Sequence, residues 1–369
     1  MVDLQGQYLR LKPEIDEAIQ QVLNSTAFIQ GPQVQSFAKA LAEYNEIDHV
    51  IPCGNGTDAL QIALMALDLK PGDEVILPVF TYVATAEVIA LLNLKPVFVD
   101  VNPDDFNIEI RELEKVITGQ TKAIVPVHLF GQCAPMESLL DLAKKYNLFI
   151  VEDAAQALGA EYTFSNGKKM KAGTMGNIGC TSFFPSKNLG AFGDGGALFC
   201  RDEALATKIK KIANHGQGKK YYHEIIGVNS RLDTLQAAIL EVKLKHLNDF
   251  TKRRQAVASF YDKALGSLEY LRIPERNTWS THVFHQYTLQ IEKDRDEFQQ
   301  HLLRHQIPSM VYYPIPLHWQ EAYRSWNGDH RSFPVAESLS KSVISLPIHT
   351  ELEEGQLEKI VSAIKKYFH

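Results

Sequence analysis

The first two thirds of the chain alternate between two hydrophobic patterns, and this alternation restricts the fold more than any other feature. Five short apolar segments, typical of buried strands, are each separated from the next by a run with helical spacing. The apolar segments are 49–53 (HVIPC), 74–78 (EVILP), 96–100 (PVFVD), 123–129 (AIVPVHL) and 148–153 (LFIVED). Because strands joined by crossover helices run parallel, the pattern predicts a mostly parallel central sheet with helices on both faces, an α/β fold.

The pattern changes after about residue 270. Residues 230–265 contain no glycine or proline, which predicts one long helix or two joined helices. Beyond them, shorter alternating segments and a final helical run indicate a small α+β domain. We therefore expect a large domain over residues 1–250, which begins with an N-terminal arm, and a small C-terminal domain over residues 251–369.

The charge and hydropathy of the chain exclude several classes of partner. The formal net charge is −6 at pH 7, so no overall positive field attracts nucleic acid or an anionic membrane surface. The N-terminus has no continuous apolar stretch of the kind found in signal peptides, and the apolar runs elsewhere are too short to cross a bilayer. We expect a cytoplasmic protein that binds neither nucleic acid nor membrane.

The four cysteines are scattered singly, at positions 53, 133, 180 and 200. None of them has a second cysteine or a histidine at the spacing of a zinc site or a redox pair. We interpret them as buried thiols and expect no metal site.

Two strand ends carry polar residues suited to ligand binding, because ligands of open α/β sheets lie beyond the carboxyl ends of the strands. After the first strand, Gly56 and Thr57 open a helix in the segment CGNGTDAL. Such a turn offers free N–H groups to a phosphate, although Thr57 can equally be an ordinary helix N-cap. After the fifth strand, alternation places Glu152 and Asp153 on opposite sides. A carboxylate buried at this strand end is costly unless a cation or a hydrogen-bonded proton lies beside it. Alternatively, the carboxylate caps the segment that follows.

A single lysine, Lys187, stands between an apolar strand-like segment and a glycine-rich loop in CTSFFPSKNLGAFGDGG. A loop lysine on its own is usually solvent-exposed. Together with a phosphate-binding turn and a buried carboxylate, however, it completes the set that pyridoxal 5′-phosphate (PLP) chemistry requires. The lysine amine binds the cofactor aldehyde, the carboxylate keeps the ring nitrogen protonated, and the turn holds the phosphate.

Five motifs in this order resemble the DegT/StrS sugar aminotransferases, and they extend over nearly the whole chain. They are GNGTDALQIAL (54–64), FTYVATAE (80–87), VEDAAQALGA (151–160), TSFFPSKNLGAFGDGGAL (181–198) and GVNSRLDTLQAAIL (227–240). The resemblance implies the aspartate aminotransferase fold, which is PLP transferase fold type I. It also implies PLP as the cofactor and a homodimer with shared active sites.

The resemblance assigns roles around the cofactor. Lys187 forms the Schiff base, Asp153 pairs with the pyridine nitrogen and Gln156 contacts the 3′ oxygen of the ring. Tyr82 stacks on the ring. The phosphate is held by three residues of one subunit and by an asparagine of the neighbouring subunit: Gly56, Thr57, Ser182 and, from the neighbour, Asn229.

The lysine also indicates the reaction. The family's sugar 3-dehydratases carry histidine at the position of Lys187, so the resemblance implies transamination, with L-glutamate as amino donor and a nucleotide-linked keto sugar as acceptor. The segments around Lys187 and Arg231 resemble members that aminate C3 of UDP-2-acetamido-2-deoxy-3-oxo-glucuronate for O-antigen synthesis. In that group Arg231 of the partner subunit meets the sugar carboxylate, and Ser186 and Tyr313 match substrate contacts.

Three alternatives stay open at this point. Arg231 can instead form a salt bridge with Asp233. Phe28 and Tyr312 stand where the similar members have a tyrosine and a histidine, and this leaves a dTDP-linked 3-keto-6-deoxyhexose as a second acceptor. A catalytically silent regulatory member of the family is the third alternative, which the intact set of Lys187, Asp153 and Ser182 disfavours.

Overall fold

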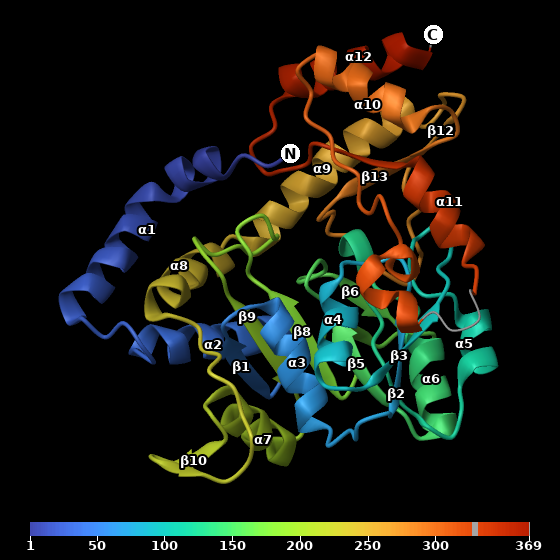
Figure 1. Cartoon of the computed structure of the whole chain (residues 1–369). Coiled ribbons are helices and arrows are strands. Elements are labelled where there is room, and N and C mark those ends of the chain that lie inside the picture. Colours follow the sequence, from blue (N-terminus) through green and yellow to red (C-terminus); the bar gives the residue numbers. More distant parts are fainter. Residues whose placement is uncertain (327–330, 369) are drawn as a thin grey trace.

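The protein is described from a computed structural model, in which residues 1–326 and 331–368 are described (Figure 1). A seven-stranded sheet forms its centre. All neighbouring strands in it run parallel except the pairs that include β9, which is antiparallel to both of its neighbours. In their order across the sheet, the strands are β1 (His49–Cys53), β9 (Gly196–Cys200), β8 (Ile178–Ser182), β5 (Phe149–Asp153), β4 (Thr121–Ile124), β2 (Glu74–Pro78) and β3 (Lys95–Val99). The mostly parallel α/β fold is therefore confirmed.

The fourth predicted strand is shorter than the sequence pattern suggests. The pattern predicts extended backbone over residues 123–129, but β4 ends at Ile124. Pro126 has no N–H group to donate to the ladder, and only the isolated parallel bridge between Val127 and Asp153 continues the pairing. The chain then turns away from the sheet beside the end of β5, where a ligand site is expected.

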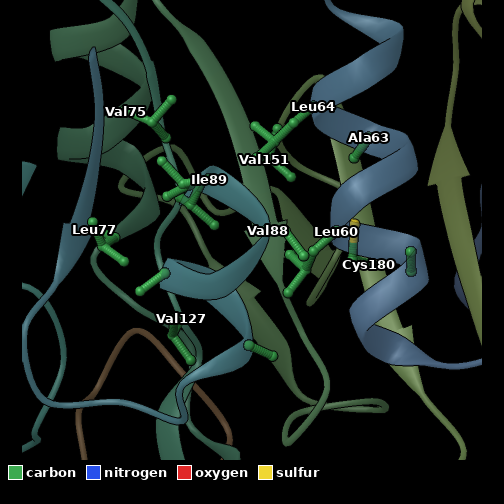
Figure 2. Close-up of a cluster of buried hydrophobic side chains, with 14 of the residues drawn as sticks. Leu60, Ala63, Leu64, Val75, Leu77, Val88, Ile89, Val127, Val151 and Cys180 are labelled. Atoms are coloured by element: carbon green, nitrogen blue, oxygen red, sulfur yellow. The ribbon is translucent and has the colours of Figure 1, made fainter. Parts of the chain in front are cut away.

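Helices cover both faces of the sheet because successive side chains of each strand point to opposite faces. In β2, Val75 and Leu77 join one buried cluster and Ile76 joins another. On the first face, α3 (Gly56–Ala66) packs against β5 and β8, and α4 (Ala84–Leu91) packs against β2 and β3. Figure 2 shows Leu60 and Leu64 of α3 directed toward the sheet in this cluster. The second face is covered by α5 (Ile110–Val116) and α6 (Met136–Tyr146).

The first two helices of the chain pack on a pair of helices that leads to the C-terminal part. Helices α1 (Leu4–Ser25) and α2 (Pro32–Asn45) share a buried cluster with α8 (Thr234–Leu244). The helical stretch predicted over 230–265 consists of two joined helices, since α9 (Leu247–Leu265) begins three residues after α8 ends. The expected domain boundary at residue 250 lies within α9, which extends into the C-terminal part in Figure 1.

The C-terminal part has its own buried cluster, formed by residues between 257 and 364. Three antiparallel strands make its sheet: β12 (Leu271–Arg272), β13 (Tyr287–Ile291) and β14 (Val343–Leu346). Helices α10 (Arg295–Arg304) and α12 (Glu354–Phe368) pack with α9 around it. The remaining elements are α7 (Glu203–Ala213), α11 (Pro334–Ser342), β6 (Glu161–Thr163), β7 (Lys169–Lys171), β10 (Gln217–Lys219), β11 (Tyr222–His223), and the short helices η1 (Leu129–Gly131), η2 (Leu317–Trp319) and η3 (Glu321–Trp326).

Two expectations about the chain as a whole can be compared with this structure. In residues 1–326 and 331–368, no helix has both the length and the apolar character needed to span a membrane.

All four cysteines are free and buried, as expected. Burial raises the pKa of the thiols, to about 12 for Cys133 and about 11 for Cys200, so they are held as neutral apolar groups.

Candidate active site

A cavity of ≈ 670 Å³ lies beyond the carboxyl ends of β5 and β8, where the N-terminus of α3 and the loop after β8 meet residues of the C-terminal part. Most of the residues predicted for the site line this cavity: Gly56, Thr57, Tyr82, Asp153, Gln156, Ser182, Ser186, Lys187, Tyr312 and Tyr313. They come from segments far apart in the sequence, and the edge of the sheet brings them together.

One end of the cavity is built to hold an anion. Helix α3 begins at Gly56, and its N-cap is Asn55, whose side chain accepts a hydrogen bond of 2.8 Å from the Asp58 N–H. Thr57 is therefore not the N-cap, and its side chain is not needed for capping. A Cβ on Gly56 would lie 2.7 Å from the Ser182 Cβ, so only glycine allows this close approach. The N-terminal N–H groups of α3, with Thr57 and Ser182 beside them, suit a phosphate.

The two carboxylates at the end of β5 lie in different surroundings, as the alternation of side chains along a strand predicted. Glu152 is fully buried away from the cavity and its oxygens accept four hydrogen bonds. The donors are His128 Nε2 at 2.8 Å and the backbone N–H groups of Gly173, Met175 and Gly176 at 2.8, 2.6 and 2.6 Å. Glu152 thus stabilises the loop before β8 and has no capacity left for a ligand.

Asp153 lines the cavity and keeps an acceptor position for a ligand. Its Oδ2 accepts a hydrogen bond of 2.9 Å from the Thr85 hydroxyl, and its Oδ1 accepts one of 3.1 Å from the Ala155 N–H. Each carboxylate oxygen has two lone pairs, so Asp153 is able to accept from a protonated ring nitrogen as well.

Lys187 lies on the loop between β8 and β9, and its backbone N–H donates to the Phe184 carbonyl at 2.8 Å. Burial lowers the pKa of its amine to about 8, while the negative charge of Asp153 opposes this shift. An amine with this pKa is partly unprotonated near neutral pH, which both nucleophilic attack and proton transfer require. Lys187 and Asp153 line the same cavity, as a shared cofactor site requires.

Gln156 and three tyrosines, Tyr82, Tyr312 and Tyr313, also line the cavity. Gln156 Oε1 accepts from the Phe130 N–H at 2.8 Å, and its Nε2 donates to the Tyr313 hydroxyl at 3.1 Å. The Tyr82 ring is 57% exposed, and its centroid lies 6.3 Å from that of Tyr313. Tyr82 therefore presents a free aromatic face toward the cavity mouth, as stacking on a planar ligand requires.

Several cavity residues were not identified from the sequence. His285 and Gln286 come from the segment before β13, which reads as an ordinary strand, and Thr81 follows β2. Burial lowers the pKa of His285 well below its usual value, and the positive charges of Lys187 and Arg254 lower it further. Two of these cavity residues each carry a buried polar atom that has no hydrogen-bond partner in the described part of the chain. The atoms are Nδ1 of His285 and Oγ1 of Thr81. No spacing or composition signal in this segment distinguishes it from a strand that serves the core alone.

Three predicted residues do not line the cavity of this chain: Phe28, Asn229 and Arg231. Phe28 is 43% exposed and its carbonyl accepts a hydrogen bond of 3.0 Å from the Thr234 N–H at the start of α8. Asn229 is exposed, and in the described part of the chain Arg231 forms no ion pair with Asp233. The contacts of Asn229 and Arg231 with a partner subunit stay predictions, as does the contact of Phe28 with the substrate.

The residues present fit PLP. The close approach of Gly56 and Ser182 at the α3 N-terminus leaves a cradle for a phosphate. The unpartnered Thr81 hydroxyl offers a polar contact, and Lys187 and Asp153 supply the amine and the carboxylate that the cofactor needs. A type I sheet with this set of groups at its carboxyl edge defines a PLP-dependent transaminase.

Comparison with known proteins identifies the family. A model of the DegT/DnrJ/EryC1/StrS aminotransferase family matches residues 10–365, and the chain belongs to this family. Its members are PLP-dependent sugar aminotransferases, and this chain is a transaminase of that kind.

Similar proteins carry several names. The chain is 45% identical to the "Pleiotropic regulatory protein" of Geobacillus stearothermophilus (100% of this chain, 98% of the other) and 44% identical to UDP-2-acetamido-2-deoxy-3-oxo-D-glucuronate aminotransferase of Pseudomonas aeruginosa (98% of each). It is 40% identical to dTDP-3-amino-3,4,6-trideoxy-alpha-D-glucose transaminase of Streptomyces venezuelae (99% and 95%). The solved structure of S. venezuelae DesV in complex with a ketimine intermediate superimposes with a TM-score of 0.95 at 39% identity (100% and 98%).

Proposed function

We propose that the protein transfers the amino group of L-glutamate to C3 of UDP-2-acetamido-2-deoxy-3-oxo-glucuronate, in the synthesis of O-antigen or another surface polysaccharide. The observation that carries the proposal is the cavity that joins Lys187, Asp153 and the α3 phosphate turn. The 44% identity to the P. aeruginosa enzyme over 98% of both chains supports this acceptor.

The roles of the residues follow from their positions. Bound PLP supplies an electron sink and carries the amino group from donor to acceptor. The N-terminus of α3, Thr57 and Ser182 hold the phosphate, and Asp153 holds the proton on the ring nitrogen. Lys187 would hold the cofactor through its amine, and the freed amine would act as general base and general acid for the proton of the donor Cα. The same amine moves the proton in the opposite direction when the keto sugar is aminated.

We further propose a homodimer in which Phe28, Asn229 and Arg231 complete the site of the partner subunit. All three lie beside the start of α8, exposed or half-buried and away from the cavity of their own chain. Arg231 is the cation suited to the uronate carboxylate, since a guanidinium binds a carboxylate through two parallel hydrogen bonds. Asn229 would contribute to the phosphate and Phe28 to the sugar.

Two other functions have weaker support. The similarity to the S. venezuelae dTDP-sugar transaminase supports a dTDP-linked 3-keto-6-deoxyhexose as the second candidate acceptor. This sugar offers no carboxylate to Arg231. A purely regulatory role is suggested only by the name of the G. stearothermophilus relative, and the complete set of cofactor-binding groups disfavours it.

A direct competition tests the acceptor. UDP-2-acetamido-2-deoxy-3-oxo-glucuronate, made in situ by its dehydrogenase, is offered with L-glutamate beside dTDP-linked 3-keto and 4-keto sugars, and the aminated products are identified by mass spectrometry. We expect amination of the UDP-linked uronate. Conversion of the dTDP sugars alone would show that the proposed acceptor is wrong.

The lowered pKa of Lys187 predicts the pH dependence of cofactor binding. In the cofactor-free protein, the Lys187 amine reacts with the PLP aldehyde only when it is unprotonated. The rate of attachment should therefore rise about tenfold per pH unit below pH 8 and level off above it. Stopped-flow absorbance between about pH 6 and pH 10 measures this rate, and pyridoxamine phosphate, which has no aldehyde, serves as a control. A rate that still rises above about pH 9 would show that burial does not perturb the amine.

A substitution at Arg231 tests the carboxylate contact. We expect Arg231→Ala to raise the KM for the UDP-linked uronate about 10- to 100-fold, because a charge-assisted hydrogen bond to the substrate is lost. The KM for a dTDP-linked 3-keto-6-deoxyhexose, whose sugar ring carries no carboxylate, should change little. Arg201→Ala, which removes a surface arginine paired with Asp48, is the matched control. Equal losses for both acceptors would assign Arg231 to the fold and not to the carboxylate.

A further inference from the structure

Lys243 is a buried lysine that the proposed chemistry does not use. It lies near the C-terminal end of α8, is 2% exposed, and donates a hydrogen bond from Nζ to the Gly190 carbonyl. Its Nζ also lies 5.4 Å from the centroid of the Phe192 ring. Within residues 1–326 and 331–368, Lys243 forms no ion pair with a carboxylate.

A buried lysine lowers the free energy of unfolding. The packing of the core therefore does not explain why a lysine occupies this position. Burial lowers the pKa of Lys243 to about 8. Because the folded protein binds this proton less tightly than the unfolded chain does, the ammonium lowers the free energy of unfolding at neutral pH, and this cost diminishes as the pH rises above 8. A methionine of similar length would fill the same space without the desolvation penalty.

The Gly190 carbonyl, which accepts the hydrogen bond from Lys243, belongs to the loop that carries Lys187. Gly190 comes three positions after Lys187 and folds back on the start of the loop, where a Cβ on Gly190 would lie 2.3 Å from the Pro185 carbonyl oxygen. The neighbouring Ala191 N–H donates to the Phe183 carbonyl at 2.8 Å. The Gly190 carbonyl is thus fixed to the same tight turn that presents Lys187 to the cavity.

Two other side chains fix the same loop from its flanks. The Phe192 N–H donates to Gln236 Oε1 of α8 at 2.8 Å. On the other flank, Asn188 Nδ2 donates to the Val283 carbonyl of the C-terminal part at 3.0 Å. The contact from Lys243 is the charged one of these three, and charge-assisted hydrogen bonds are about twice as strong as neutral ones.

We propose that Lys243 is a positioning residue for the reaction, which holds the Lys187 loop through the Gly190 carbonyl and so sets the placement of the Lys187 amine. This inference depends on the proposed role of Lys187. It accounts for a charged group kept in the α8 core at a cost in stability, since removing the cation would release the loop at its tightest turn.

The test uses the PLP-loaded enzyme and three variants: Lys243→Met, Lys187→Ala and the control Lys245→Met, which changes an exposed lysine two residues further along the chain. Hydrogen exchange of the loop amides is measured by mass spectrometry, beside the Tm and the pH titration of the cofactor absorbance. For Lys243→Met we expect about tenfold faster exchange in residues 183–192 and a shifted titration midpoint, with the Tm within about 4 °C of the unchanged protein.

The outcomes separate the inference from the proposed function. Unchanged loop exchange and an unchanged titration in Lys243→Met would overturn the inference, as would equal effects in Lys245→Met. Retained transamination in Lys187→Ala would overturn the proposed function, whatever Lys243→Met shows. If Lys243→Met does not yield folded protein, Lys243→Gln, which keeps a neutral donor, is measured in the same way, and wild-type loop exchange together with a wild-type titration in that variant would overturn a role that requires the cation.

Discussion

Replacement of Lys187 by alanine is expected to lower the rate of transamination at least about 10,000-fold. The variant loses the group that binds the cofactor and also the acid and base that moves the proton, and a positioned proton-transfer group alone is worth about 100- to 10,000-fold. Among the described residues that line the cavity, Lys187 is the only lysine, so no second amine replaces it. The measurement is the formation of 2-oxoglutarate from L-glutamate in a single turnover.

The controls for this variant separate chemistry from folding. Lys168→Ala, in the exposed turn between β6 and β7, removes a lysine of equal size and should retain full activity. The Lys187→Ala protein should keep its Tm or gain slightly, because a buried amine with a lowered pKa no longer opposes folding. The protein as purified should also lose the yellow colour of lysine-bound cofactor. Full activity in Lys187→Ala would remove the central assignment.

Replacement of Asp153 by asparagine is expected to lower the rate about 100- to 1000-fold while the fold is retained. The carboxylate proposed to keep the ring nitrogen protonated becomes neutral, and the loss of one preorganised electrostatic contact costs about this much. Asparagine can keep both present hydrogen bonds, since its oxygen accepts from the Ala155 N–H and its amide donates to the Thr85 hydroxyl. Single-turnover kinetics with L-glutamate measure the rate, and thermal unfolding measures the fold.

Glu152, which precedes Asp153 in β5, provides a matched comparison. Its replacement is expected to lower stability and to leave the catalytic rate nearly unchanged. Glu152→Gln also replaces a buried carboxylate by an amide, but its NH₂ group would face donors that now point at a carboxylate oxygen, such as the Gly173 N–H. We expect a loss of about 3 kcal/mol or more in the free energy of unfolding. In the fraction that folds, the catalytic rate should stay close to that of the unchanged protein. If both variants lost activity equally without a difference in stability, the assignment of separate roles to the two carboxylates would be wrong.

Strand alternation and helix signals predicted much of the fold. The sheet, its helices on both faces and the two-helix stretch up to Leu265 follow from local hydrophobic periods, which depend on neighbouring residues only. The opposite facing of Glu152 and Asp153 follows from the same rule. The rule failed where backbone chemistry intervened, as at Pro126, which ends the regular pairing of β4. The capping role that was one of two alternatives for Thr57 belongs to Asn55.

Local sequence rules did not predict the cavity residues that come from distant segments of the chain. His285 and Gln286 belong to a segment whose pattern matches a core strand, and they reach the site only because the Val283 N–H donates to the Gly131 carbonyl and the Gln286 N–H to that of Phe130. Lys243 similarly occupies an ordinary position in an apolar helix. Its burial and its contact with Gly190 depend on how α8 packs against the loop, which no local pattern encodes.

The sequence by itself determined the α/β class and the PLP cofactor, and it singled out the lysine proposed to bind it, because these depend on local periods and on residue types whose chemistry is fixed. The tertiary structure alone decided how far the Lys187 amine is removed from water and which side chains hold its loop. Those properties arise from desolvation and from contacts between segments far apart in the chain, and their energies exist only when the segments are packed together.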